Sequence, residues 1–146
     1  MTALTKDPSE IYQYLLIARS LATLPSNDLA FPVYPRREPN KPDDCITVYD
    51  TDPTLLGSDM ISGYEETQYG LQIRIRTRSP SVNKAWTIVR SLSKVNKQEV
   101  TIGYTSFVVN RCHLISGPIS LGTSVSPQSG LYLFTINYSS QIKELP

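Results

Sequence analysis

Apolar and polar residues alternate with a period of two over residues 67–77, and this pattern predicts a β-strand. The apolar row contains Leu71, Ile73 and Ile75. Because successive side chains of a strand point to opposite faces, we expect that row to pack under the helices of the domain, mainly under the second one. The polar row of the same strand carries the arginines Arg74, Arg76 and Arg78.

Two segments have helical periodicity. The Asp7–Glu10 stretch predicts the start of the first helix, with Asp7 as the cap and Glu10 reaching back to the amide of the cap residue. Apolar residues then recur at helical spacing, so this helix is expected over 8–24. A second start signal, Ser followed by Pro, predicts a helix over 80–95 whose apolar face includes Trp86. With Trp86 in the core, Trp86→Ala is expected to cost about 3–5 kcal/mol.

The rest of the chain divides into short β-rich segments and polar connections. The Ser-Gly-Pro sequence at 116–118 is expected to end the strand before it. The remaining expected strands cover 45–49, 99–103, 106–115 and 132–138. The expected connections are a proline-rich extended arm at 32–44, an exposed loop at 50–66 and a polar C-terminal tail at 139–146.

The order of the expected elements is α, β, β, α, β, β, β. Helices that are segregated in this way from a mostly antiparallel sheet are typical of an α+β domain, here with two main helices packed on the sheet. The length of 146 residues suits a single domain, 1–146, with its own hydrophobic core.

Composition narrows the possible partners. The net charge of +1 provides no overall attraction to nucleic acid or to an anionic membrane, so any basic function must be local. No run of about 18 apolar residues occurs, and no membrane span is expected. The N-terminal segment is interpreted as an amphipathic helix and not as a signal peptide. Cys45 and Cys112 are expected to be buried thiols, although a disulfide between them stays open.

Catalytic and metal-binding patterns are nearly absent from the sequence. His113 is the single histidine, and it points away from its neighbour Cys112 on the same strand, so only Cys45 remains as a possible partner for it. The carboxylates at 43–44 and 50–52 are better explained by turns and helix capping than by a cation. No phosphate-binding loop, dinucleotide fingerprint or zinc motif is found. We therefore expect no enzyme, no cofactor and no metal.

The three arginines of the 67–77 strand are the main candidate for a functional surface. Together with the basic residues of the proline-rich arm they could contact nucleic acid, but aromatic residues do not interleave with them as in a stacking platform. An ordinary solvent-exposed face or a protein interface is the preferred interpretation, because arginine pairs well with carboxylates and tyrosine is favoured at interfaces. The residues assigned to this subunit interface or ring lumen are Arg74, Arg76, Arg78, Arg36, Arg37, Tyr34 and Tyr64.

Three segments carry a resemblance to a known family. They are PDDCITVYDT at 42–51, GLQIRIR at 70–76 followed by the second helix, and SGPISLG at 116–122 followed by the last strand. In this order they resemble the minor capsid proteins of tailed bacteriophages, a family that is similar in element order to phage tail terminator proteins. The resemblance extends over about 8–138, and the sequence departs from the family pattern in the loop after the third segment.

The resemblance implies a structural protein of the virion, at the head-proximal end of the tail. Proteins of this kind form a homo-oligomeric ring, expected to be a hexamer, that ends the tail tube and contacts the head–tail connector or neck protein. DNA would meet such a ring only in transit, and no membrane is involved. The alternatives are a neck or head-completion subunit of the same virion, and a small nucleic-acid-binding module that uses the Arg74, Arg76 and Arg78 row.

Overall fold

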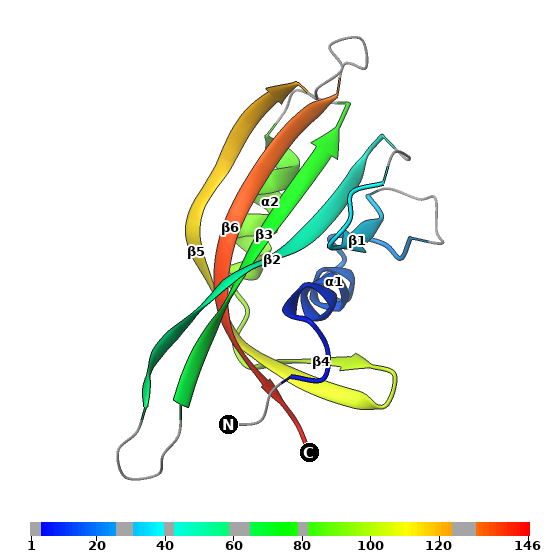
Figure 1. The fold of residues 1–146 in the computed structure, drawn as a ribbon. Helices are drawn as coiled ribbons and strands as arrows, with labels where there is room; N and C mark the ends of the chain where they lie inside the picture. Colours follow the sequence, from blue (N-terminus) through cyan, green and yellow to red (C-terminus); the bar gives the residue numbers. More distant parts are fainter. Residues whose placement is uncertain (1–3, 26–30, 40–42, 59–64, 79–81, 124–130) are drawn as a thin grey trace.

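The computed structural model describes residues 4–25, 31–39, 43–58, 65–78, 82–123 and 131–146 (Figure 1). These residues form two short helices and six strands. In chain order they are α1 (Pro8–Ala18), β1 (Val33–Pro35), β2 (Cys45–Ser58), β3 (Glu65–Thr77), α2 (Asn83–Leu92), β4 (Gln98–Ile102), β5 (Thr105–Thr123) and β6 (Tyr132–Glu144).

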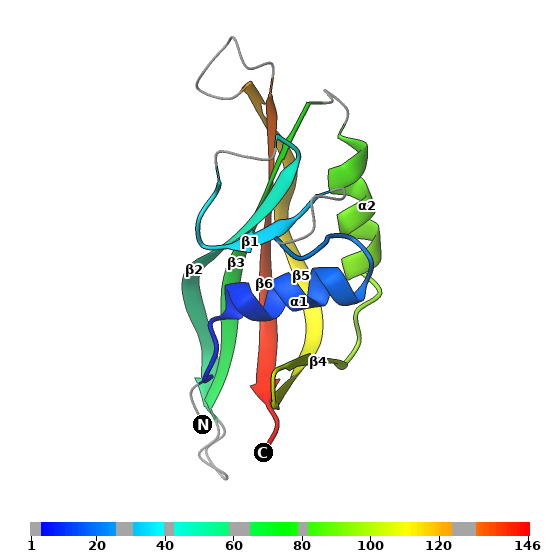
Figure 2. The same cartoon turned by 90° about the vertical axis from the view of Figure 1, so that its right-hand side faces the viewer.

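The strands form one curled sheet in the order β1-β2-β3-β6-β5-β4. Only β1 and β2 run parallel, and every other neighbouring pair is antiparallel. Figure 2 shows α1 crossing the sheet and α2 lying alongside the strands, so the sheet curls around both helices. We call the face that carries the helices the inner face and the opposite one the outer face.

The inner face is built from rows of apolar side chains that continue from strand to strand. Ile73 pairs with Val48 of β2 and Ile136 of β6, and all three are fully buried. The alternation in β3 was therefore interpreted correctly, because Leu71, Ile73 and Ile75 all face the core. Burial of one such side chain contributes about 1.5–3 kcal/mol.

The contacts of the two helices differ from the expected ones. The row on β3 packs under α1, whereas α2 contacts β5 and β6. The prediction that the second helix mainly covers β3 was therefore wrong. It placed the helix according to its position in the sequence, but β6 inserts between β3 and β5 and shifts α2 along the sheet.

The α+β prediction of two main helices packed on the sheet was also wrong, because the protein is mostly β-sheet. The helices have only 11 and 10 residues, whereas β5 alone has 19. Strands β2 and β3 extend through most of the segment expected as a loop at 50–66, and β6 continues to Glu144 through the expected tail. A hydrogen bond of 2.8 Å from the Thr5 amide to the Glu144 carboxylate links that end of β6 to the N-terminal segment.

The start of α1 is held by a residue from the sheet. Asp7 occupies the cap position but makes no side-chain capping bond. Instead, the carboxylate of Asp50 on β2 accepts hydrogen bonds from the Ser9 amide at 2.8 Å and from the Ser9 hydroxyl at 2.7 Å. A carboxylate at this position satisfies a free amide of the first turn and is favoured by the helix dipole. The capping role expected for the 50–52 carboxylates is thus confirmed for Asp50, while the role given to Asp7 was wrong.

Trp86 does not belong to the core. Its side chain is 42% exposed, whereas Ala85, Ile88 and Leu92 form the buried face of α2. The helix is shorter than expected and is rotated so that its smaller apolar residues face the sheet. The large cost predicted for Trp86→Ala therefore no longer follows.

Candidate assembly interface

The arginines of β3 lie on the outer face, as the alternation requires, but each one has a partner within its own subunit. The guanidinium of Arg74 lies 5.6 Å from the ring centre of Tyr49, its neighbour on β2. Arginine stacks well on an aromatic face, and such a contact contributes about 0.5–2 kcal/mol. The Nε atom of Arg74 is buried and has no hydrogen-bond partner among the described residues.

Arg76 is only 7% exposed, because the proline-rich arm folds back over it. Its Nε donates to the Asp43 carbonyl at 3.2 Å, and its Nη1 lies 3.9 Å from the Glu38 carboxylate. Both partners belong to the arm at 32–44. In this structure, the part of the arm that carries them packs on its own sheet.

Arg78 forms a paired contact with Asp44 at the end of β3. Its amide donates to Oδ1 of Asp44 at 2.9 Å, and its guanidinium lies 3.3 Å from Oδ2. Burial alone would raise the pKa of the Asp44 carboxyl, but the hydrogen bonds from Arg78 and Thr77 outweigh it and hold this pKa below its ordinary value. Asp44 is therefore an ionised partner of Arg78 at neutral pH.

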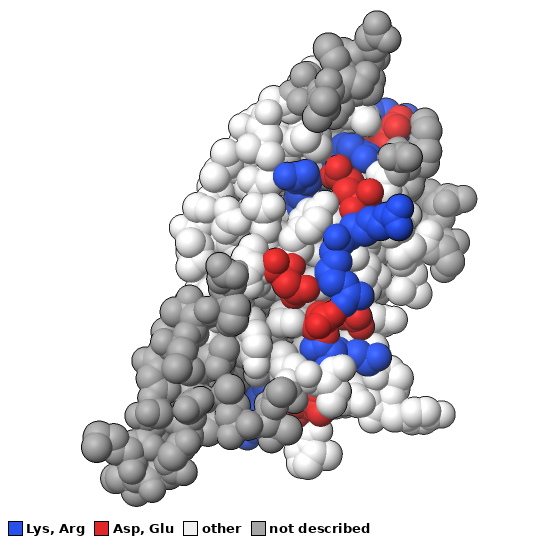
Figure 3. Space-filling model, viewed as in Figure 1, with Lys and Arg blue, Asp and Glu red and all other residues white. Residues whose placement is uncertain are grey.

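The basic residues of the arm differ in their environment. Arg36 contacts the carboxylates of Asp7 and Glu10 at the start of α1, the second at 2.9 Å. Arg37 is exposed, and Tyr34 is half-buried in β1. Tyr64, also assigned to the interface, lies outside the described residues. Figure 3 shows basic and acidic residues intermixed in one band. The band therefore has little uncompensated charge, and an interface role for these residues stays a prediction.

A different surface of the sheet has the character of an interface. Strand β4 pairs with β5 only as far as Val109, so the rest of β5 has β6 on one side and no described strand on the other. Four large apolar side chains are exposed along this part of β5: Leu114 (43%), Ile115 (63%), Ile119 (43%) and Leu121 (48%). We call residues 112–121 the β5 edge. Figure 3 shows an uncharged surface over β5 and β6, beside the mixed band.

The β5 edge was missed because its sequence contains a strand breaker. Gly117 and Pro118 were expected to end the strand, but β5 continues through them with shifts in its pairing to β6. Proline is tolerated where a strand has no neighbour to receive its amide, which is the situation at a sheet edge. The signal available in the sequence was the apolar content of Leu-Ile-Ser-Gly-Pro-Ile-Ser-Leu on both sides of the break.

An unpaired edge with exposed apolar residues favours association. Outside Pro118 it presents backbone donors and acceptors that another strand can pair with. Proteins that remain monomeric commonly protect such edges with charges, prolines or bulges. No lysine, arginine, aspartate or glutamate occurs within the β5 edge.

The possible catalytic pair does not form. Cys45 lies on β2 and His113 on β5, and because β3 and β6 lie between these strands, three strand spacings of ~4.8 Å separate the two residues. Burial raises the pKa of Cys45 to about 11 and also raises that of Cys112, so both are protonated thiols at neutral pH. Neither forms a disulfide. Within the described ranges, no cluster of three or more His, Cys, Asp or Glu side chains is arranged to hold a metal ion.

The comparisons with known proteins do not identify the chain. No family model matches it, and no curated protein matches its sequence. Among the described residues, no helix is long and apolar enough to cross a membrane.

Proposed function

We propose that this protein is a structural subunit of a tailed-bacteriophage virion, which forms a ring that ends the tail tube and joins it to the head–tail connector. The proposal combines the three sequence segments that resemble the minor capsid family with the exposed, apolar β5 edge. The β5 edge is the observation that supports an assembly role most strongly. The location in the virion and the expected six-fold ring derive from the resemblance alone.

A closed ring requires a head-to-tail contact, in which two different surfaces of the subunit meet. The β5 edge can provide one of these surfaces, since it offers both strand pairing and apolar side chains. Its exposed residues would be removed from water in the contact, and apolar burial contributes about 25 cal/mol per Å². In this proposal the bonded arginines of β3 stabilise the subunit, and the protein has no catalytic role.

Electron microscopy of tail tubes tests the proposal directly. Purified protein is mixed with tubes that lack their head-proximal cap, and we expect a ring at one end of each tube. A variant with a charge in the β5 edge, Ile115→Lys, should leave the tubes uncapped. Protein that joins isolated heads instead of tubes would support the neck or head-completion alternative, and protein that joins neither would refute a virion role.

A further inference from the structure

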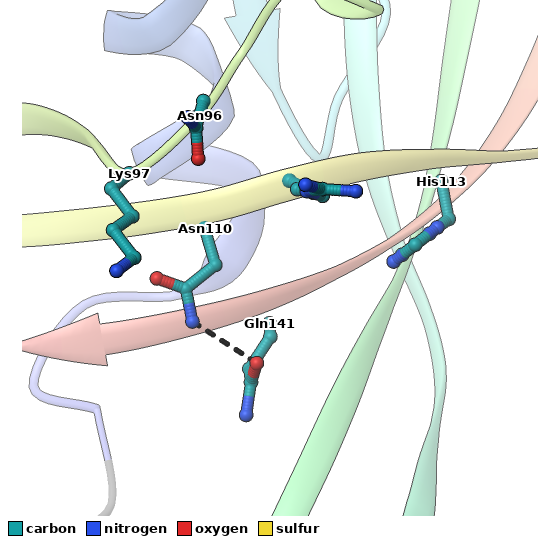
Figure 4. A pocket seen from close by; sticks show the side chains of 6 residues that line it. Asn96, Lys97, Asn110, His113 and Gln141 are labelled. Atoms are coloured by element: carbon teal, nitrogen blue, oxygen red, sulfur yellow. Dashed lines mark hydrogen bonds between the residues drawn. The ribbon is translucent and has the colours of Figure 1, made fainter.

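A polar hollow lies on the outer face of the sheet where β4, β5 and β6 meet. Its volume is about 230 Å³, and a water molecule occupies ~30 Å³ in the liquid, so it can hold several small groups. It is lined by Asn96, Lys97, Asn110, Arg111, His113 and Gln141. Figure 4 shows Lys97, Asn110 and Gln141 near one end of the hollow, with His113 further along β5.

Specific backbone features shape this hollow. The pairing of β5 with β6 shifts between Val109 and Cys112, and the two residues in between, Asn110 and Arg111, both line the hollow. Irregularities of this kind re-aim side chains and are common beside functional sites. Lys97 has a left-handed backbone (φ 49°), and its amide donates to the Asn110 carbonyl at 2.9 Å. The hollow is therefore held in place by bonds between the turn before β4 and β5.

The amide side chains leave hydrogen-bond donors available. Nδ2 of Asn110 donates to Oε1 of Gln141 at 3.0 Å, which fixes the orientation of both amides. Because the Gln141 oxygen is the acceptor in this bond, its amide nitrogen keeps both of its hydrogens for another partner.

The basic residues of the hollow, unlike the arginines of β3, have no partner within the described part of the subunit. The side chains of Lys97, Arg111 and His113 make no hydrogen bond or ion pair with any described residue. No acidic residue is among those that line the hollow, and Glu99, two positions from Lys97, does not contribute to it. In a chain with a net charge of only +1, Lys97 and Arg111 form a local concentration of unpaired positive charge.

We propose that this hollow binds the phosphate backbone of a nucleic acid strand. Arginine can contact a phosphate with two parallel hydrogen bonds, lysine acts as a point charge, and amide nitrogens donate to the remaining oxygens. The basic side chains are spread along the hollow, as the positions of Lys97 and His113 in Figure 4 show. Donors from the turn before β4 and from different positions along β5 suit a strand with several phosphates better than one small anion. The hollow has no aromatic residue for base stacking, so binding is independent of base sequence.

Fluorescence anisotropy with labelled oligo(dT) and oligo(dA) tests the inference. With two charged contacts to phosphate, from Lys97 and Arg111, log K should fall against log salt concentration with a slope of about −1.4, because each contact contributes about −0.7 for a single strand. The two oligonucleotides should bind within about twofold of each other. The double substitution Lys97→Gln/Arg111→Gln should weaken binding at low salt at least tenfold and bring the slope close to zero.

The matched control is Arg90→Gln/Lys94→Gln, which removes the same two charges from exposed positions at the end of α2. It should retain binding within about twofold. Equal weakening in both double variants would show diffuse attraction and overturn the proposal, as would unchanged binding in Lys97→Gln/Arg111→Gln.

Amide NMR signals of the unmodified protein provide a second test. Oligo(dT) should shift those of 96–97, 110–113 and 141, and shifts caused by inorganic phosphate alone, with no response to DNA, would also overturn it.

Discussion

At the scale of single residues, the role of an arginine on the outer face of β3 depends on which residues cover it. Arg76 has the sequence position of an exposed interface residue, but Glu38 and the Asp43 carbonyl enclose it. A guanidinium in such surroundings contributes to the stability of its own subunit, and removal of its charge leaves partners uncompensated. The effect of changing it should therefore appear in folding before it appears in assembly.

Arg76→Glu is expected to lower the free energy of unfolding by about 3 kcal/mol or more, since the new carboxylate would be buried beside Glu38. Urea denaturation measures the difference. The control is Arg90→Glu, an equal charge change at an exposed position of α2, and it should cost under about 1 kcal/mol. Equal costs for the two variants would contradict the buried role of Arg76.

The paired contact between Asp44 and Arg78 should make the free energy of unfolding depend on pH in the acidic range. The pKa of Asp44 in the folded protein lies below its ordinary value of 3.8, so the folded state favours the ionised form. Its contribution is present above about pH 4 and is lost as the pH falls through the lowered pKa. Urea unfolding between about pH 6 and 2 should show a shallower loss of stability in Asp44→Asn than in the unmodified protein. If the loss of stability with acid is equally steep in Asp44→Asn and in the unmodified protein, the Asp44–Arg78 contact is not its source.

At the scale of elements, β5 shows why a local breaker can be overruled. Gly117 has φ 102°, and a Cβ atom there would lie 2.6 Å from the Thr135 carbonyl oxygen of β6. The strand therefore passes through this point only because glycine allows both the backbone angle and the close approach. Pairing with β6 on both sides of Gly117 keeps the two parts of β5 in one strand.

Gly117→Ala is expected to destabilise the protein by more than about 2 kcal/mol, because the added methyl group meets backbone atoms that cannot move independently. Gly103→Ala is the matched control. Gly103 also has a left-handed backbone, with φ 62°, but a Cβ there meets nothing within 4 Å, so only the backbone cost of about 1 kcal/mol remains. Thermal unfolding of both variants gives the comparison. A similar loss in the two would show that the close approach to Thr135 is unimportant.

These elements also show what the sequence can and cannot predict. Alternation identified the buried row of β3, because the direction of a side chain in a strand is a local property. The cap of α1 could not be identified, since Asp50 is 41 residues away from Ser9 and is brought to it only by the fold. The cover over Arg76 was missed for the same reason, and the length of β5 was missed because pairing with β6 overrides the local breaker. Each depends on how distant segments pair, and the rules for prolines and charges describe only near neighbours.

At the scale of the whole molecule, charge and apolar exposure are separated. The mixed band, in which acidic and basic residues compensate each other, lies on one side of the molecule, and the β5 edge is uncharged and apolar (Figure 3). Apolar contacts weaken little with salt, whereas ion pairs are screened. Assembly through the β5 edge should therefore persist at high salt, while nucleic acid binding at the polar hollow should disappear. The two surfaces can thus be tested independently.

The most direct test of assembly through the β5 edge is the solution mass of the protein, measured by light scattering at low and high salt. We expect a multiple of the 16.3 kDa subunit mass, six subunits in the proposed ring, either alone or after addition of tail tubes. Ile115→Lys should remain a folded monomer in every condition, whereas Thr101→Lys, which adds the same charge at an exposed position of β4, should assemble normally. A persistent monomer of the unmodified protein, or normal assembly of Ile115→Lys, would contradict the account.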